Sequence, residues 1–462
     1  LSTLSVPGLR PGDEFGFAVS LDGNRLAVGA PGDGGAFDSL IFSGAVYLFS
    51  FADQAFGAPV LEAIIGQGYS GGKNLSVPIN GLEQFGASVS LDGLQLAVGA
   101  PGNAGALGST SSAGAVYLFN FTDPLFSGGS LQATIGLGYT GTRDIDLSQL
   151  ATDDGFGRSV ALSGTRLAVG APGDDALNDT AAGSGAVYLF TFADAQFTSG
   201  VLEGTIGFGY SAGAKDLDIN RPDTQLQAGD AFGTSVAFDG LNLFVGAPGD
   251  RGAADNLVNA GAVYGITFTN SAFDLPQLVR IIGSGFAEPG DTDVSFLGSS
   301  DQFGTAVSAS AGLLVVGAPG DGGANDSVPS SGKAYLFSLS NGTYTQTGAI
   351  GRGYGGDLDL PLGQLAVGDG FGNSLSLNQN RLVVGASGDM GADNSDFGFG
   401  AVYLFAFTGS NFAGLSFEGT FGRGYGSLKN IAVPQLSTND RFGSAVSVSY
   451  THLRAHETPE HL

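Results

Sequence analysis

Cysteine and tryptophan are absent from the 462 residues, and histidine occurs only as His452, His456 and His461. Without cysteine the chain has neither a disulfide framework nor a thiolate metal site. Because the sequence before His452 contains no His or Cys, a Ser-His-Asp or Cys-His nucleophile cannot be assembled within it.

Positive charge is also scarce. The chain has 17 Lys and Arg against 43 Asp and Glu, which gives a net charge of -26. This balance argues against nucleic-acid binding, which needs basic patches. Apolar runs end early at Gly, Asp or Ser, whereas a membrane-spanning helix needs about 20 apolar residues. Hydrophobic residues nevertheless make up 42%, so the chain can bury a large core and is not a disordered acidic polymer.

Glycine is abundant, with 80 residues, but it lacks the period of three that marks collagen. Instead, the dipeptide Phe-Gly recurs at spacings of 68 to 76 residues. The copies begin at Phe15, Phe85, Phe156, Phe232, Phe303, Phe371 and Phe442. A long, nearly fixed period of this kind indicates stacked supersecondary units.

Each unit contains four apolar segments of strand length, bounded by turn residues. In the third copy they begin at Phe156, Arg166, Gly185 and Leu202. A tight Gly-containing turn joins the first two, which predicts a hairpin. Four antiparallel strands per unit favour an all-β propeller with one blade per repeat. The alternative is a β-helix or solenoid, whose coils are usually shorter, roughly 20–30 residues.

The succession FG, LAVGAPGD and GAVYLF resembles the FG-GAP repeat of integrin α-chain propellers and of many bacterial surface proteins. The Gly-Ala-Pro element begins at Gly29, Gly99, Gly170, Gly246 and Gly317, and the sixth copy has Ser387 in place of proline. The resemblance implies a seven-bladed propeller, with six complete blades of about 70 residues here and part of another. Independently of the resemblance, we predict that the Phe of each FG and the Tyr of each GAVYLF are core residues between blades.

We divide the chain into three parts. Residues 1–12 are interpreted as the end of a preceding repeat, and residues 13–447 as the propeller. Residues 448–462, which include VSYTHLRAHET, resemble a translated sequencing adapter. We predict that this tail is not native and exclude it from the fold.

Most of the acidic residues fall in two kinds of loop. One kind follows each Gly-Ala-Pro, and the other joins one blade to the next. Because successive loops of an up-and-down blade alternate between faces, we expect both kinds to share one face. So much like charge should repel unless cations screen it.

Asp, Asn and backbone oxygens in Gly-rich loops are ligands that Ca²⁺ prefers. The sequence therefore predicts calcium as a possible cofactor of the blades with dense acidic loops. The candidate metal ligands are Asp174, Asp175, Asn178, Asp179, Asp321, Asn325, Asp326, Asp389, Asp393 and Asp396. The resemblance does not supply integrin calcium ligands, since the DxDxDG-like string is missing. The alternative is that these residues only form loops and keep the protein soluble.

The leading functional hypothesis is a non-catalytic, extracellular or cell-surface platform for binding and adhesion. Its partner would be a protein or glycan on the acidic loop face, without nucleic acid or membrane insertion. On this hypothesis the protein is not an enzyme. The alternatives are a carboxylate-dependent hydrolase or lyase on a propeller scaffold, and a structural spacer in a surface fibre.

Overall fold

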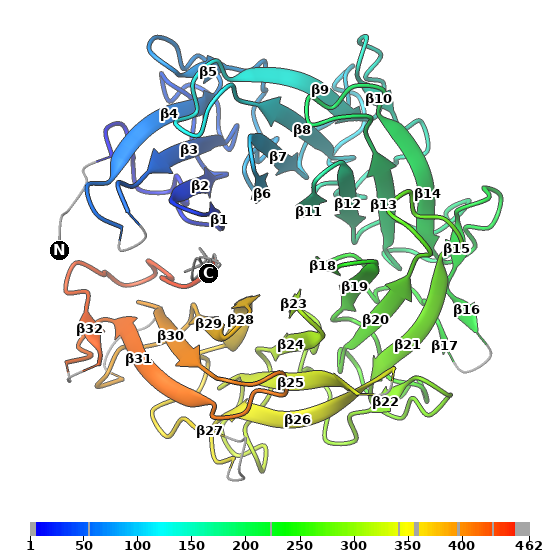
Figure 1. Ribbon diagram of the computed structural model, residues 1–462, viewed down its shortest axis with the longest axis vertical. Coiled ribbons are helices and arrows are strands. Elements are labelled where there is room, and N and C mark those ends of the chain that lie inside the picture. Colours follow the sequence, from blue (N-terminus) through cyan, green and yellow to red (C-terminus); the bar gives the residue numbers. More distant parts are fainter. Residues whose placement is uncertain are drawn as a thin grey trace, which may run out of the picture.

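The computed structural model describes residues 6–53, 56–221, 224–340, 342–354, 360–394, 398–426 and 429–448. In these residues all regular structure is β: six five-stranded sheets stand as blades around a central axis, and a small two-stranded sheet lies outside them (Figure 1). The all-β propeller prediction is confirmed, and the solenoid alternative is excluded. No helix capable of crossing a membrane occurs in the described ranges.

The first three blades follow one another in chain order. Blade one contains β1 (Ala18–Asp22), β2 (Arg25–Ala30), β3 (Ala45–Ser50), β4 (Val60–Gly66) and β5 (Leu75–Ser76). Blade two contains β6 (Ser88–Asp92), β7 (Gln95–Ala100), β8 (Ala115–Asn120), β9 (Ser130–Gly136) and β10 (Ile145–Asp146). Blade three contains β11 (Ser159–Ser163), β12 (Arg166–Ala171), β13 (Ala186–Thr191), β14 (Val201–Gly207) and β15 (Leu217–Asp218).

A two-stranded sheet, β16 (Asn220–Arg221) and β17 (Thr224–Gln225), precedes blade four. Blade four contains β18 (Ser235–Asp239), β19 (Asn242–Ala247), β20 (Ala262–Thr267), β21 (Gln277–Gly283) and β22 (Thr292–Asp293). Blade five contains β23 (Ala306–Ser310), β24 (Leu313–Ala318), β25 (Lys333–Ser340), β26 (Thr343–Gly351) and β27 (Leu360–Pro361). Blade six contains β28 (Phe371–Asn378), β29 (Arg381–Ala386), β30 (Ala401–Ala406), β31 (Ser416–Gly422) and β32 (Ile431–Ala432).

The expectation of four strands per blade was incomplete. The four long strands pair antiparallel in chain order, but a fifth, two-residue strand pairs parallel with the outermost one, as β10 does with β9. An aspartate or asparagine side chain fixes the segment that leads back to this fifth strand. In blade two the backbone N–H of Thr134 donates to Asp144 Oδ1 at 2.7 Å. Two residues are too few to show a strand period, which is why the sequence did not indicate this strand.

Glycine is required where neighbouring blades meet. A Cβ on Gly170 would lie 1.9 Å from the backbone oxygen of Gly233, the FG glycine of the next blade. Backbone atoms at that distance cannot move aside, so any side chain would separate the blades. Gly233 itself has a φ of 95°, which favours glycine. The same contact recurs at Gly29 with Gly86, Gly99 with Gly157, Gly246 with Gly304, Gly317 with Gly372, and Gly385 with Gly443.

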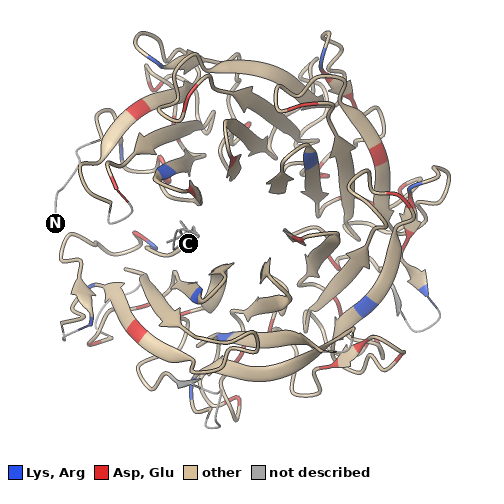
Figure 2. Cartoon of the chain, in the orientation of Figure 1, with Lys and Arg blue, Asp and Glu red and all other residues tan. Residues whose placement is uncertain are grey.

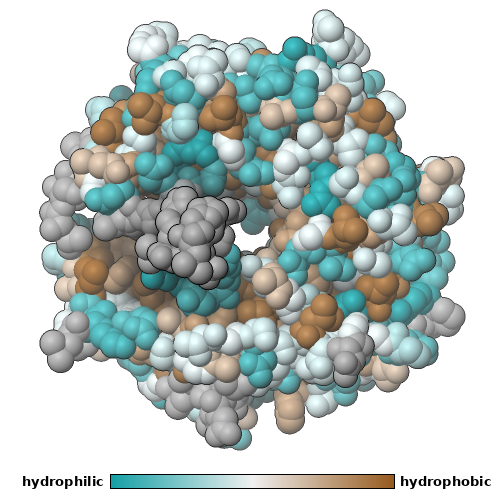
Figure 3. Space-filling model, viewed as in Figure 1, coloured by the Kyte–Doolittle hydropathy of each residue, from teal (hydrophilic) through white to brown (hydrophobic). Residues whose placement is uncertain are grey.

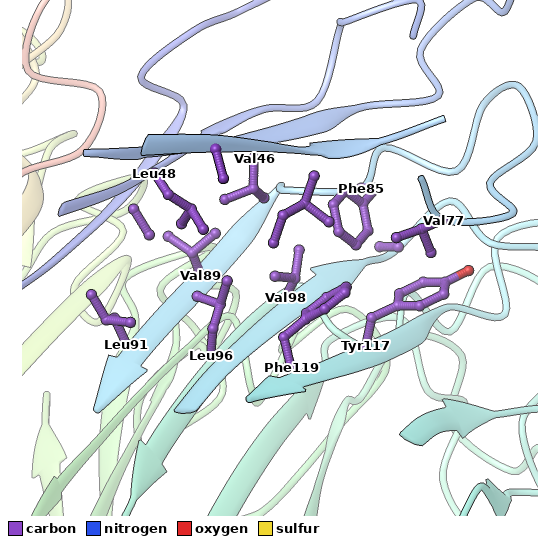
Figure 4. Packing of buried hydrophobic residues seen from close by; sticks show 14 of the residues in the cluster. Val46, Leu48, Val77, Phe85, Val89, Leu91, Leu96, Val98, Tyr117 and Phe119 are labelled. Carbon is purple, nitrogen blue, oxygen red and sulfur yellow. The ribbon is translucent and has the colours of Figure 1, made fainter. Parts of the chain in front are cut away.

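Apolar side chains fill each blade seam, the interface between two adjacent blades. In the seam between blades one and two, Val46 and Leu48 of β3 point toward Val89 and Val98 of β6 and β7 (Figure 4). Phe85 belongs to the same cluster and has no exposed surface. Burying a large apolar side chain stabilises the fold by about 1.5–3 kcal/mol.

The aromatic residues of the repeat are core residues, as predicted. Phe85 packs edge-on against Tyr117, with ring centroids 5.3 Å apart, and both rings are buried. Phe15 and Phe442 are the exceptions, since 40% of the surface of Phe15 is exposed and Phe442 is only half-buried. Phe85 forms a parallel β-bridge with Gly44 of blade one. No corresponding bridge to Phe15 occurs among the described residues.

The inner strands are linked by serine side chains. The N–H of Leu91 donates to Ser20 Oγ at 2.9 Å, and the N–H of Leu162 donates to Ser90 Oγ at 3.1 Å. The last described residues extend this pattern, because Val448 N donates to Ser376 Oγ and Leu21 N donates to Ser447 Oγ.

The described residues form six blades rather than seven. The expected extra strand from Phe442 is not confirmed, since residues 442–448 contain only an isolated bridge between Phe442 and Gly400. Apart from Val448, the predicted adapter-like tail lies outside the described residues.

Candidate functional site: buried acid pockets beneath a loop face

The loops after Gly-Ala-Pro and the loops between blades form one surface, which we call the loop face. Leu82 N, in the loop between blades one and two, donates to Ile41 O, in the loop after β2, at 2.7 Å. Asp153 N and Ser111 O repeat this contact one blade further on, at 2.9 Å. Acidic residues gather in loops around the ring, while the strands carry few charges (Figure 2).

Two positions of each repeat meet beneath the loop face and form what we call an acid pocket. The first lies two residues before the FG phenylalanine and is occupied by Asp13, Glu83, Asp154, Asp230, Asp301 and Asp369. The second follows the Gly-Ala-Pro-Gly segment and is occupied by Asp33, Asn103, Asp174, Asp250, Asp321 and Asp389. All twelve residues are at most 6% exposed. Buried charges at this density must be hydrogen-bonded or neutralised.

The second position is held by tyrosine hydroxyls and by its own loop. In blade three, Tyr188 Oη donates to Asp174 Oδ2 at 2.7 Å, and Tyr210 Oη donates to both carboxylate oxygens at 3.0 Å. Ala176 N donates to Asp174 Oδ1 at 2.9 Å, which closes an Asx turn. Burial, reinforced by the charge of Asp174, raises the pKa of Tyr188, so this hydroxyl remains a donor.

The first position uses one carboxylate oxygen to fix its loop. Ala151 N donates to Asp154 Oδ2, and Ala366 N donates to Asp369 Oδ2, both at 2.7 Å. The other oxygen differs, because Asp154 Oδ1 and Asp369 Oδ1 are buried and accept no hydrogen bond. An unsatisfied buried acceptor costs about 1–3 kcal/mol, and more when it is charged.

Burial raises the pKa of the first aspartate to about 7 in four blades, at Asp154, Asp230, Asp301 and Asp369. At Asp154 the hydrogen bond from Ala151 N opposes the rise, whereas the charges of Asp174, Asp175 and Asp179 add to it. Desolvation also raises the pKa of Asp174. Both partners therefore disfavour the doubly charged pair.

Two blades place a side-chain nitrogen in the pocket, which leaves the pocket with less negative charge than two aspartates alone would have. In blade two, Asn103 Nδ2 donates to Glu83 Oε2 at 2.9 Å, and Tyr117 Oη also donates to Glu83 Oε2 at 3.0 Å. In blade five, the buried Lys333 places its Nζ 3.9 Å from Asp321 Oδ2. Its ammonium also lies over the ring of Tyr335, 3.8 Å from the centroid.

The predicted calcium ligands divide into buried and exposed groups. Asp174, Asp321 and Asp389 are second-position residues of acid pockets, and tyrosine hydroxyls donate to each of them. Asp175 is half-buried, and its Oδ1 accepts a hydrogen bond from Gly183 N. The exposed members are Asn178, Asp179, Asn325, Asp326 and Asp393, while Asp396 lies outside the described residues.

No three acidic side chains converge on a common metal position in the described part of the chain. Asp179 and Asp326 have φ values of 54° and 50°, a left-handed conformation that Asp adopts more readily than most residues. The inter-blade carboxylates also hold backbone groups: Thr205 N donates to Asp216 Oδ1, and Ile281 N donates to Asp291 Oδ1. Many of the loop carboxylates therefore fix the backbone by accepting hydrogen bonds from it. Calcium binding stays a prediction.

The loop face also exposes large apolar side chains. Phe37, Ile41, Leu107 and Phe296 are 81%, 72%, 89% and 82% exposed, the highest values among the large apolar residues that the structure describes. All four lie in loops of this face. Apolar surface occurs as separate patches around the ring in the view of Figure 3.

A hollow of about 310 Å³ opens on the loop face of blade one. It is lined by the polar residues Arg10, Asp13 and Asp38 and by the apolar Leu40 and Ile41. Arg10 forms an ion pair with Asp38. The hollow therefore combines charged groups with apolar contact surface.

The repeated blades with a glycine-locked seam define a propeller of the FG-GAP architecture. A family model described as FG-GAP repeat matches residues 6–49, 80–119, 146–190, 225–267, 297–337 and 365–405. These segments cover more than half of the chain. The chain therefore belongs to the FG-GAP repeat family, as the sequence motifs indicated.

No curated protein matches this chain. Solved structures resemble it only distantly. A proposed 6-phosphogluconolactonase from Bacteroides uniformis is 12% identical, with 90% of this chain and 86% of that chain covered and a TM-score of 0.45. The periplasmic gluconolactonase of Pseudomonas aeruginosa is 13% identical, with 87% of each chain covered and a TM-score of 0.42.

A Chaetomium thermophilum protein bound to the N-terminus of a ribosomal protein is 12% identical, with 87% and 74% covered and a TM-score of 0.39. The statement that this chain is not an enzyme was wrong as an exclusion, because two of the similar structures carry lactonase names. Likeness at this level assigns no activity to this chain, so its enzyme status is open.

Sequence reasoning placed Asp154 and Asp174 on the same face but not in one pocket. It also missed Lys333. A signal was available, since an acidic residue precedes every FG by two positions and Lys333 replaces the alanine of the other third strands. What the sequence could not supply was the burial of these groups.

Proposed function

We propose that the protein is an extracellular binding and adhesion platform whose loop face takes a protein or glycan ligand. The observation that carries this proposal is the exposure of Phe37, Ile41, Leu107 and Phe296 among the carboxylates of that face. Exposing large apolar side chains to water is unfavourable. Burying them against a ligand would recover that free energy. Aromatic side chains are also frequent anchors of interfaces.

The hollow in blade one is the first candidate for direct ligand contact. It lies beside Ile41, and the carboxylates of Asp13 and Asp38 and the guanidinium of Arg10 line it. A pocket with an apolar wall and a few polar groups suits a sugar ring or a peptide side chain. The rigid ring of blades supports this geometry from below.

The test uses a printed glycan array and immobilised collagen, fibronectin and fibrinogen as probes. The variant Phe37→Ser with Ile41→Ser should reduce binding at least tenfold while leaving the melting temperature unchanged. Leu275→Ser is the matched control, because Leu275 is 65% exposed in the loop between β20 and β21, away from the loop face. Equal loss in both variants, or no binding by the unmodified protein to any probe, would overturn the proposal.

Calcium remains part of the proposal only for the exposed oxygen donors, which are Asn178, Asp179, Asn325, Asp326 and Asp393. Calcium that binds only the folded protein would raise its melting temperature. Melting curves in CaCl₂ are compared with MgCl₂ and NaCl at matched ionic strength. A calcium-specific rise supports the cofactor, and equal curves reduce these residues to a solvated surface.

We also propose that the space between blades six and one is the position of a seventh blade. The serine contacts of Val448 and Leu21 support it, because they repeat the spacing seen between adjacent inner strands. Replacing the residues after Val448 with a copy of residues 378–440 tests this, because Val448 stands at the position of Leu377 in the repeat. A rise in melting temperature with an unchanged monomer mass is expected, whereas an unchanged or lower melting temperature would contradict it.

A further inference from the structure

One row of side chains in blade four differs from the same row in the other five blades. It crosses β19, β20 and β21, where Phe244, Gly265 and Arg280 are register partners. In the other blades the middle residue is always leucine and the residue of the outer strand is Ala or Gly. The same row of blade two consists of Ala97, Leu118 and Ala133.

The exchanges in this row depend on one another. A Cβ on Gly265 would lie 2.5 Å from Cγ of Arg280, so a leucine in the middle of the row would displace the arginine. Phe244 belongs to the buried cluster between blades four and five, where it packs edge-on against Tyr344 with ring centroids 5.3 Å apart. Blade four has therefore exchanged a leucine for an arginine side chain in the seam that faces blade five.

The arginine in this seam has no counter-charge. Arg280 is 9% exposed, and its Cζ lies over the ring of Tyr344, 4.8 Å from the centroid. Within the described ranges, Arg280 forms no ion pair, and its Nη1 is buried without a hydrogen-bond partner. Tyr344 is 1% exposed, and its Oη is also buried without a partner. An unsatisfied buried group of this kind calls for an explanation, such as a bound water or ion.

Both unpaired groups are hydrogen-bond donors. Arginine stays protonated in proteins, although burial lowers the pKa of Arg280. Burial and the charge of Asp239 raise the pKa of Tyr344 to about 12, against the opposing effect of Arg280, so the hydroxyl keeps its proton. The Asp239 carboxylate already accepts hydrogen bonds from Ala311 N at 3.1 Å and from Gly312 N at 2.7 Å. The seam thus contains a positive charge and two donors, and lacks an acceptor for them.

Stacking on an aromatic ring accounts for only part of this arrangement. Arg166 lies over the ring of Phe238 in the seam between blades three and four, 5.0 Å from the centroid, so a cation–π contact is one way in which this fold holds an arginine. The contact at Arg280 differs in two respects. Its ring carries a hydroxyl, and the arginine is more deeply buried than the half-buried Arg166.

We propose that a small monovalent anion, such as chloride, binds in the seam between blades four and five and accepts hydrogen bonds from Arg280 Nη1 and Tyr344 Oη. The anion supplies the acceptor that both donors lack and the negative charge that the guanidinium lacks. A water molecule would supply only the acceptor. Buried charges are paired in folded proteins, and an anion pairs this one.

The experiment measures the melting temperature in sodium chloride and in sodium gluconate, at equal ionic strength and with chelator. Chloride that binds only the folded protein raises the melting temperature as its concentration grows. At a tenfold excess over the dissociation constant, the rise should be about 1–2 °C for a chain of this length. Gluconate, which is much larger, is the reference anion.

Two variants and one control assign the effect to this seam. Tyr344→Phe keeps the ring and removes one donor, so it should weaken chloride binding about tenfold. Arg280→Met removes the charge and should abolish the chloride-dependent rise. Arg381→Met is the matched control, because it removes the same charge from an exposed position in β29 and should keep the full rise.

A combined variant covers the case in which Arg280→Met does not fold. Phe244→Ala with Gly265→Leu and Arg280→Ala gives blade four the row found in blade two. This variant should fold, and its melting temperature should be the same in chloride and in gluconate.

Crystals grown in bromide give a direct readout, because bromide scatters anomalously. A peak within hydrogen-bond distance of both Arg280 Nη1 and Tyr344 Oη is expected. Three results would overturn the proposal: equal melting curves of the unmodified protein in chloride and gluconate, a full chloride-dependent rise in Tyr344→Phe and in the combined variant, or a water molecule without bromide between the two donors.

Discussion

The blade seams and the loop face follow different rules. At the seams every blade repeats the same contact, in which the backbone of one FG glycine lies on the Gly-Ala-Pro glycine of its neighbour. On the loop face each blade has its own set of charges over an unchanged loop geometry. Contacts between backbones leave no room for a side chain, whereas a hydrogen-bonded loop tolerates different side chains at its exposed positions.

Substitution of a seam glycine should give the largest effect and is the strongest test of the difference between the blade seams and the loop face. Gly170→Ala should cost more than about 4 kcal/mol of folding free energy or prevent folding, because its Cβ would meet the Gly233 backbone oxygen at 1.9 Å. Chemical denaturation monitored by circular dichroism provides the measurement. Gly363→Ala is the control, since a Cβ there meets nothing within 4 Å, and it should be nearly neutral.

A second test compares two copies of the same core residue. Phe156→Ala should cost about 3–5 kcal/mol, because the ring is fully buried against Tyr188 and Phe190. Phe15→Ala should cost clearly less, because 40% of that side chain is exposed. Equal losses in denaturant titrations would show that Phe15 is covered in solution.

The acid pocket lies between the two regions and should give an intermediate effect. Tyr188→Phe removes the 2.7 Å hydrogen bond to Asp174 and should cost about 1–3 kcal/mol at pH 7. The loss should be larger for Tyr264→Phe, because Asp174 keeps the hydrogen bonds from Tyr210, whereas Phe286 stands at the equivalent position beside Asp250. Urea titration of both variants measures the difference, and a neutral Tyr188→Phe would mean that water replaces the hydroxyl.

The smallest effect is expected at an exposed loop carboxylate. Asp179→Asn should change stability by less than about 0.5 kcal/mol, because Asn accepts the same left-handed backbone conformation. Asp179→Ala should cost about 1 kcal/mol for the same reason. Differential scanning calorimetry without calcium separates the two. A large loss for Asp179→Asn would show that its charge, rather than its turn, is needed.

The sequence predicted the architecture well but the acid pockets only in part. The propeller was predicted from the repeat period, the strand-length apolar segments and the FG and Gly-Ala-Pro motifs. Phe85 and Tyr117 are buried as expected. The fifth strand, of two residues, was too short to give a periodic signal. Asp174 was expected to face a metal ion, yet tyrosine hydroxyls donate to it inside the blade. Hydrogen-bond partners of a loop aspartate depend on which strands lie beneath it, and no local pattern records that.

Sequence alone determined the repeat, the strand order within each blade and the need for glycine at regular positions, because these are local and recur six times. Tertiary structure alone decided which acids meet and how they are charged. Asp154 and Asp174 are twenty positions apart, and only the β11–β12 hairpin and the loops at its ends bring them into one buried pocket. A carboxyl group changes its affinity for protons when it leaves water, and burial is a property of the assembled ring.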